Sequence, residues 1–138
     1  MQSFDHEKLQ VYQKALEFIE SLNPLFRSMR ENGQYSLSVR KHLDESSTSI
    51  PLNIAEGNGK YRPADRCRYF DIARGSALEC ASCLDVLVAK QILNAEEVLP
   101  GKKKLHGIVS MLYGLIRSNS DRFYDIGSEY TLDEEIPE

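Results

Sequence analysis

Apolar side chains recur at every third or fourth position through four successive stretches of this chain, and no stretch reads convincingly as a strand. A period of three to four residues places the apolar side chains of a stretch on one face of a helix. The predicted helices cover residues 5–31, 36–56, 63–93 and 94–123, and short links join them. Helices joined by short links pack as antiparallel neighbours. The pattern therefore predicts an all-α fold, an antiparallel up-and-down four-helix bundle.

Three prolines lie inside these stretches. Pro24 should kink or shorten the first helix, because an interior proline removes a backbone hydrogen bond and costs ~3 kcal/mol. Pro51 should leave the second helix bent but continuous, since the hydroxyls of residues 46–49 can bond to the freed backbone. Pro100, followed by Gly101, should break the fourth helix early.

The apolar positions also predict the faces that form the core. The face expected on the first helix consists of Leu9, Tyr12, Leu16, Ile19, Phe26 and Met29. The face expected on the third helix consists of Phe70, Ala73, Ala77, Cys80, Leu84, Leu87 and Gln91. Gly75, Ala77 and Ala81 of the third helix are small, so a neighbouring helix can approach closely there. Asn94 and Glu97 have the spacing of a capping box at the start of the fourth helix.

Charge divides the chain into a nearly neutral body and an acidic end. Residues 125–138 carry six acidic side chains and no lysine or arginine, which leaves 17 basic and 15 acidic residues in the rest of the chain. We therefore predict a bundle over residues 1–124 and a flexible acidic tail over residues 125–138. Neither part has the plainly basic footprint of a strong non-specific nucleic-acid binder.

Targeting signals and cysteine content favour the cytoplasm. The first residues lack a basic region followed by an apolar stretch, so no signal peptide is evident. No apolar run approaches the ~20 residues that cross a bilayer, so we expect no membrane association. Three cysteines, an odd number, fit a reducing compartment better than a disulfide framework.

Three short pieces of sequence occur in a specific order. The first is Leu9-x-Val11-Tyr12-x-x-Ala15, the second is residues 49–57, and the third is Arg68-x-Phe70-x-Ile72-Ala73-x-Gly75-Ser76-x-x-Glu79. Together they resemble a family of small four-helix-bundle proteins encoded in intervening sequences of 23S ribosomal RNA genes. The resemblance covers residues 4–117, and the sequence departs from the family pattern at residues 44–47 and 80–83 and in its acidic end.

The resemblance implies a ring-shaped homopentamer, and it brings no established activity. It also implies kinship in fold with the accessory proteins of diversity-generating retroelements, which form pentamers and bind nucleic acid and a reverse transcriptase. Those proteins are strongly basic, whereas this chain has a net charge of −4. We therefore do not carry their function over to this chain.

Polar side chains on the second and third helices form a candidate site. Ser49, Asn53 and Glu56 share a face of the second helix and can meet Ser76 and Glu79 of the third in an antiparallel pair. We call these five residues the polar ridge. Because buried polar groups must be paired, we interpret the ridge as a helix–helix or subunit contact that fixes register. The alternative is a ligand or RNA contact site.

Basic and aromatic residues alternate around the link between the second and third helices. Lys60, Arg62 and Arg66 are candidates for phosphate contact, and Tyr61 is a candidate for base stacking. In a pentamer these residues would be repeated five times and gain avidity. The alternative is a solvated face, because nearby aspartates can neutralise the arginines.

The sequence offers little support for metal or redox chemistry. Cys80 and Cys83 have a metal-like spacing, but they lie in the middle of a predicted helix, where no helix N-terminus stabilises a thiolate. No second pair of cysteines or histidines completes a zinc site. No histidine follows a glutamate by three positions, as a di-iron bundle requires. We therefore expect core thiols, no metal, no cofactor and no enzymatic activity.

These observations lead to a functional prediction. The chain should be a non-enzymatic, oligomeric binding or scaffold protein whose partner, as the origin of the family suggests, is structured RNA. The alternative is a protein–protein adaptor that binds no nucleic acid and uses the acidic tail or the opening of the ring. An enzyme built on the polar ridge is the least favoured hypothesis.

Overall fold

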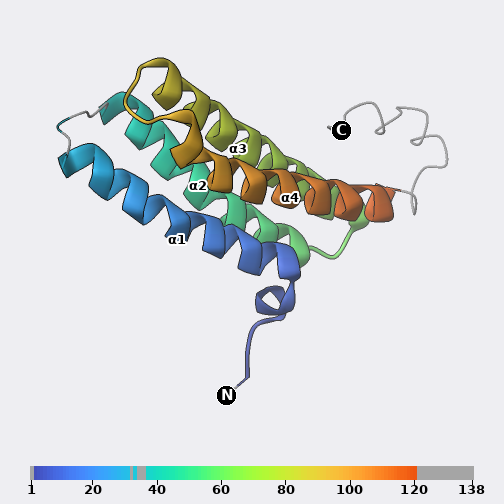
Figure 1. Cartoon of the computed structure of the whole chain (residues 1–138). Coiled ribbons are helices and arrows are strands. Elements are labelled where there is room, and N and C mark those ends of the chain that lie inside the picture. The colour runs from blue at the N-terminus through green and yellow to red at the C-terminus, as the bar shows by residue number, and fades with distance from the viewer. Residues whose placement is uncertain (1, 32, 34–36, 121–138) are drawn as a thin grey trace.

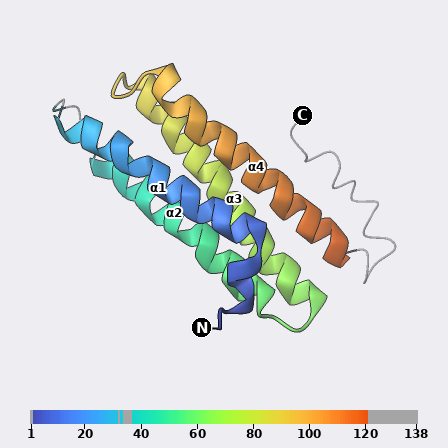
Figure 2. The same ribbon diagram turned by 60° about the horizontal axis from the view of Figure 1, so that its bottom comes forward.

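The computed structural model describes residues 2–31, 33 and 37–120. Its elements are η1 (Asp5–Lys8), α1 (Gln10–Glu31), α2 (Leu37–Asn58), α3 (Pro63–Ala89) and α4 (Ala95–Ser120). Successive helices run in opposite directions, and α1 packs against both α2 and α4 (Figures 1 and 2). The predicted all-α antiparallel bundle is confirmed, with no strand in the described ranges. The tail predicted at residues 125–138 lies outside them.

A single core fills the space between the four helices. Its largest fully buried side chains are Phe18, Phe70, Leu22, Met29, Leu43, Ile50, Ile54, Leu84, Leu87, Leu105, Ile108 and Leu112. The contacts of α3 with α2 and with α4 are the most extensive, whereas α1 packs more lightly on its two neighbours. The α2–α3 and α3–α4 pairs therefore form the best-buried part of the bundle. They position the link between α2 and α3.

Two prolines do not interrupt their helices. Pro24 lies inside α1, which continues to Glu31, and Pro100 lies inside α4, which continues to Ser120. Both proline side chains are exposed, so water can hydrate the carbonyl that each proline leaves without a helical donor. The predicted break at Pro100 is therefore wrong, and Pro24 does not shorten the first helix.

Pro51 lies inside α2 and is buried. The helix continues to Asn58, so the predicted continuity is confirmed. The hydroxyls of Ser47 and Thr48 donate to the carbonyl oxygen of Asp44, at 3.0 and 2.8 Å. These hydroxyls therefore bond to the Asp44 carbonyl, about two turns before the proline, and not to the Ser47 carbonyl that Pro51 leaves without a helical donor.

The buried face of α1 differs from the predicted one. The structure buries Val11, Ala15, Phe18, Leu22 and Met29. Of the predicted face only Met29 is buried, and Leu16 is 40% exposed. Apolar residues follow a helical period in two registers on this helix, and packing against the other helices selects the register that contains Phe18.

The close approach of α3 to a neighbouring helix occurs at a glycine of α2. A Cβ atom built at Gly57 would lie 2.9 Å from Cε1 of Phe70 and 3.0 Å from Cβ of Tyr69. By contrast, Gly75 is exposed and a Cβ there would meet nothing within 4 Å. Of the three small residues predicted to admit a neighbouring helix, Gly75 is therefore wrong within one chain, because it faces outward. Ala77 is fully buried and Ala81 packs against the core.

The turn between α3 and α4 is built by two helix caps. Lys90 ends α3, and Gln91 follows with a φ of 63°. Gln91, predicted on the core face, is exposed in this turn. The amide of Asn94 donates to the Glu97 carboxylate at 2.9 Å, and the amide of Glu97 donates to the Asn94 side chain at 2.8 Å. The predicted capping box is thus confirmed.

Candidate nucleic-acid interface

The link between α2 and α3 presents an aromatic side chain to solvent. Tyr61 is 98% exposed, the highest value among the exposed large apolar side chains. Lys60 precedes it, and Arg62, whose side chain is 78% exposed, follows it as the N-cap of α3. Pro63 occupies the first turn of α3, where its missing N–H has no helical acceptor to lose. The end of one helix and the start of the next therefore hold Tyr61 outward between two cations.

Arg66 of α3 fixes the position of this link through hydrogen bonds. Its Nη1 donates to the carbonyl oxygens of Asn58 and Lys60, at 2.8 and 3.3 Å. Its Nε donates to Oδ1 of Asn119 near the end of α4, at 3.2 Å. The guanidinium also lies 5.6 Å from the centre of the Phe70 ring. The arginine that the sequence offered as a phosphate ligand therefore ties the link to α4.

Lys60 and one further cation, Arg68, lie against the ring of Tyr69. Nζ of Lys60 lies 5.2 Å from the ring centre, and Cζ of Arg68 lies 5.0 Å from it. The carboxylate of Glu56 accepts a hydrogen bond from Lys60 and thereby raises the pKa of its ammonium. Lys60 is therefore firmly cationic, although part of its charge is neutralised by Glu56.

The aspartates predicted to neutralise this region do so in part. Asp71 accepts two hydrogen bonds from Arg74, at 2.9 and 3.1 Å. Asp65 lies 3.8 Å from Nε of Arg62, a loose ion pair across exposed side chains. We use the name basic–aromatic cluster for Lys60, Tyr61, Arg62, Arg68 and Tyr69.

The polar ridge divides into separate contacts. The hydroxyl of Ser76 donates to Oγ of Ser49 at 2.8 Å, across the α2–α3 interface. Nδ2 of Asn53 donates to Oγ of Ser49 at 2.9 Å and to its carbonyl oxygen at 2.8 Å. Glu56 pairs instead with Lys60, and Glu79 lies 3.6 Å from His42. Ser49 and Ser76 therefore connect the two helices, and Asn53 supports Ser49 from within α2.

The cysteines are placed for packing. Cys80 is fully buried, and burial raises its pKa to about 12. Burial also raises the pKa values of Cys83 and Cys67. A thiol with a raised pKa carries little thiolate near neutral pH and is a poor nucleophile or metal ligand. Among the residues that the structure describes, no three acidic, histidine or cysteine side chains are grouped as metal ligands.

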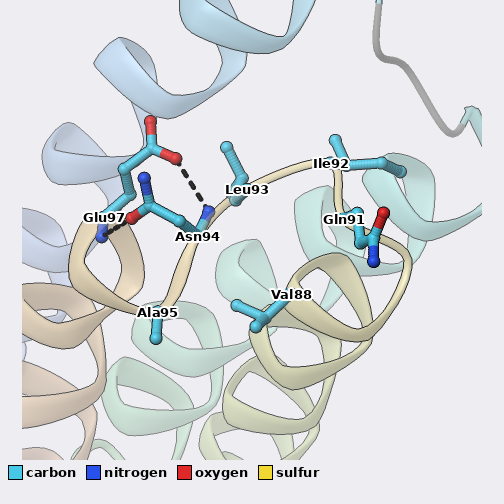
Figure 3. A pocket seen from close by; sticks show the side chains of 7 residues that line it. All are labelled: Val88, Gln91, Ile92, Leu93, Asn94, Ala95 and Glu97. Carbon is cyan, nitrogen blue, oxygen red and sulfur yellow. Dashed lines mark hydrogen bonds between the residues drawn. The ribbon is translucent and has the colours of Figure 1, made fainter.

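A hollow beside the α3–α4 turn offers no comparable chemistry. It is lined by Val88, Gln91, Ile92, Leu93, Asn94, Ala95 and Glu97. Figure 3 shows the side chains of Asn94 and Glu97 turned toward the backbone of the turn, where they make the capping hydrogen bonds. Glu97 is the single ionisable side chain of this lining, and the cap engages it. We therefore place the candidate site at the α2–α3 link.

Comparisons with known proteins agree with this architecture. Residues 7–114 match the model of the family described as 23S rRNA-intervening sequence protein. A solved structure from Bacteroides thetaiotaomicron, a protein of unknown function from the S23 ribosomal protein family, is 24% identical. It superposes with a TM-score of 0.70 over 77% of this chain and 97% of that one. Among curated proteins none matches. No described helix has the length and apolar content needed to cross a membrane.

Proposed function

Because this chain belongs to the 23S rRNA-intervening sequence protein family, we propose that it is a non-enzymatic RNA-binding scaffold that acts as a homopentameric ring. The observation that carries the RNA proposal is Tyr61, fully open to solvent between Lys60 and Arg62 on a link pinned by Arg66. Cations contact phosphates, and an open aromatic ring stacks on bases. The basic–aromatic cluster offers cations and an open aromatic ring within residues 60–69.

The charge of the cluster favours an anionic partner despite the acidic chain. The cations here, Lys60, Arg62, Arg66, Arg68 and Arg74, outnumber the carboxylates of Glu56, Asp65 and Asp71 that lie among them. The local balance is therefore positive, and the acidic residues that make the whole chain negative lie in the segment 125–138. A locally positive surface attracts RNA within about one Debye length, ~8 Å at physiological salt.

The RNA proposal is tested by fluorescence anisotropy with a labelled, structured RNA. We expect binding that weakens steeply between ~50 and ~200 mM salt, because phosphate contacts release counterions. Arg62→Glu should weaken binding by about tenfold or more, since repulsion replaces attraction. Lys103→Glu, a reversal at an exposed lysine of α4, is the matched control and should have a much smaller effect. Equal losses in the two variants would contradict a localised site.

The ring is supported by outward apolar side chains of α3. Ile72, Leu78 and Val86 are exposed, and Gly75 between them has open space beyond its Cα. A helix with apolar residues on its outer side as well as its inner side is typical of a buried position. A neighbouring copy that covers this side of α3 would provide that burial.

A protein–protein adaptor is the second candidate. Leu52 of α2 is 64% exposed, and Leu16 of α1 is 40% exposed, so apolar surface lies outside α3 as well. An adaptor would retain its protein partner in pull-downs when Arg62 is reversed. It would lose the partner on deletion of residues 125–138 if the acidic segment carries the contact. Loss of RNA binding together with retention of a protein partner would favour this candidate.

The proposal assigns no catalytic step to the chain, and it places the protein in the cytoplasm. Cys67, Cys80 and Cys83 are free thiols, which a reducing compartment maintains. The raised pKa of Cys80 argues against nucleophilic catalysis by its sulfur near neutral pH. Turnover of an RNA substrate by the purified protein would contradict the non-enzymatic part of the proposal.

A further inference from the structure

We propose that the basic–aromatic cluster recognises an unpaired nucleotide, with its base stacked on Tyr61 and a flanking phosphate held by Lys60 and Arg68. The inference rests on the proposed RNA-binding function and adds the class of RNA. Tyr61 is the stacking surface because its ring is 98% exposed. Tyr69 is unsuited to that role, because the side chains of Lys60 and Arg68 already lie about 5 Å from its ring centre.

Tyr61 is presented on an ordered support. The amide of Lys60 donates to the Gly57 carbonyl at 3.1 Å, and the amide of Gly59 donates to the Ala55 carbonyl at the same distance. Arg66 binds the carbonyl oxygens on either side of Gly59. A site whose backbone is already ordered loses less conformational entropy when a ligand binds. The ordered backbone of the link therefore favours stacking of a base on the exposed ring of Tyr61.

The two cations on Tyr69 form a phosphate site. Both lie about 5 Å from the centre of the Tyr69 ring, so two positive charges surround one side chain and both attract a phosphate placed there. The carboxylate of Glu56 engages Lys60 at 3.1 Å, and within the part of the chain that the structure describes no carboxylate forms an ion pair with Arg68. Charge-assisted bonds to phosphate are the strong class of hydrogen bond.

The shape of the cluster favours single strands over duplex. A base inside a duplex has both faces covered by its neighbours, so it cannot stack on a protruding tyrosine. Duplex binding without stacking draws on cations spread over several phosphates, whereas these cations occupy the α2–α3 link and the first two turns of α3. A single exposed ring with cations beside it suits one splayed nucleotide in a loop, bulge or end.

The test measures the affinity of the full chain by fluorescence anisotropy for a single-stranded RNA of about 12 nucleotides. A blunt duplex containing the same strand is the comparison ligand. We expect the single strand to bind about tenfold more tightly or better. Tyr61→Ala should weaken single-strand binding by about tenfold to a hundredfold, the range for loss of one stacked base. Tyr61→Phe should retain the affinity, because the ring remains.

Two further variants complete the design. Arg68→Gln should weaken binding and reduce its salt dependence, because one phosphate contact is lost. Leu52→Ala, which removes an exposed apolar side chain from the same end of α2, should leave the affinity unchanged. Tyr61 is almost fully exposed, so its replacement leaves the fold intact and a loss of binding is attributable to the ring.

The outcomes separate the two proposals. Equal affinity for the single strand and the duplex, or an unchanged affinity in Tyr61→Ala, would overturn the unpaired-nucleotide inference. If Arg62→Glu still abolished binding in that case, the RNA-binding function would stand. No binding of either RNA at low salt would overturn both. Single-strand preference that is lost in Tyr61→Ala and kept in Tyr61→Phe would establish the inference.

Discussion

The packing of α2 against α3 leaves no room for a side chain at Gly57. A Cβ there would lie 2.9 Å from a ring carbon of Phe70, whose side chain is fully buried and cannot move aside. Gly57→Ala should therefore lower the free energy of unfolding by about 1–3 kcal/mol, the range for overpacking. Urea denaturation followed by circular dichroism measures the change.

The control is a glycine of α4 with open space around it. A Cβ at Gly107 would meet nothing within 4 Å. Gly107→Ala should raise stability by about 0.5–1 kcal/mol, because alanine loses less backbone entropy in a helix. A stabilising effect at both positions would show that α2 and α3 separate more easily than their contact distances indicate.

Arg66 illustrates how one side chain can serve structure beside a candidate binding site. It is half-buried and donates to Asn58, Lys60 and Asn119. Arg66→Ala should lower the free energy of unfolding by about 1–3 kcal/mol, since three acceptors lose a charged donor. Arg66→Lys should recover only part of this loss, because an ammonium cannot reproduce the planar fork of donors.

The comparison variant for Arg66 is Arg62→Ala. Arg62 is 78% exposed and makes one loose ion pair, so its loss should change stability by less than about 0.5 kcal/mol. Differential scanning calorimetry of the two alanine variants measures both effects. Equal stability of the two variants would show that Arg66 does not hold the link. Arg66 would then again be a candidate for phosphate contact.

At the scale of the helices, local chemistry predicted two helix starts and most of the buried face of α3, but not the buried face of α1. Pro63 marks the start of α3 and the Asn94 capping box the start of α4, because both signals act over a few residues. The face of α1 could not be chosen locally, since apolar residues fit two registers. The register with Phe18 inside depends on side chains of the other helices.

The end of α3 carries backbone strain that a substitution can remove. The amide of Gln91 donates to the Val88 carbonyl, and the amide of Ile92 donates to the Leu87 carbonyl, both at 2.9 Å. This pair of bonds is the Schellman motif, which needs a left-handed residue and favours glycine. Gln91 has a φ of 63°, so Gln91→Gly should raise stability by about 1 kcal/mol. The melting temperature should rise by roughly 3 °C.

Lys90 is the matched position for that prediction. It precedes Gln91 and has a right-handed φ of −81°, so glycine offers no relief there. Lys90→Gly should lower stability by about 0.5–1 kcal/mol through added freedom of the unfolded chain. A melting temperature that falls in both variants would show that the side chain of Gln91 contributes more than its strained backbone costs.

At the scale of the molecule, the candidate site was predictable in part. Lys60, Tyr61 and Arg62 are adjacent in sequence, so their grouping needs no knowledge of the fold. The role of Arg66 depends on Asn119, 53 residues away, and no local pattern joins the two. Long-range pairings of this kind arise from helix packing, which is why the sequence assigned Arg66 to phosphate rather than to the bundle.

The outer side of α3 is the surface through which we expect copies of this chain to assemble. Leu78 is 46% exposed there, beside the open surface at Gly75, and the proposed ring would bury it against a neighbouring copy. Native mass spectrometry should show a pentamer for the unmodified chain. Leu78→Lys should yield folded monomers, because the exposed side chain contributes little to the isolated bundle but would place a charge in the interface.

The control for assembly is Leu99→Lys. Leu99 is 51% exposed on α4, so the same change of chemistry is made at similar exposure on a different helix. This variant should remain pentameric, and circular dichroism should show that both variants keep their helices. An unmodified chain that is monomeric at micromolar concentration would refute the ring. Repetition of Tyr61 around one particle would then no longer supply avidity, and any RNA binding would rest on a single cluster per molecule.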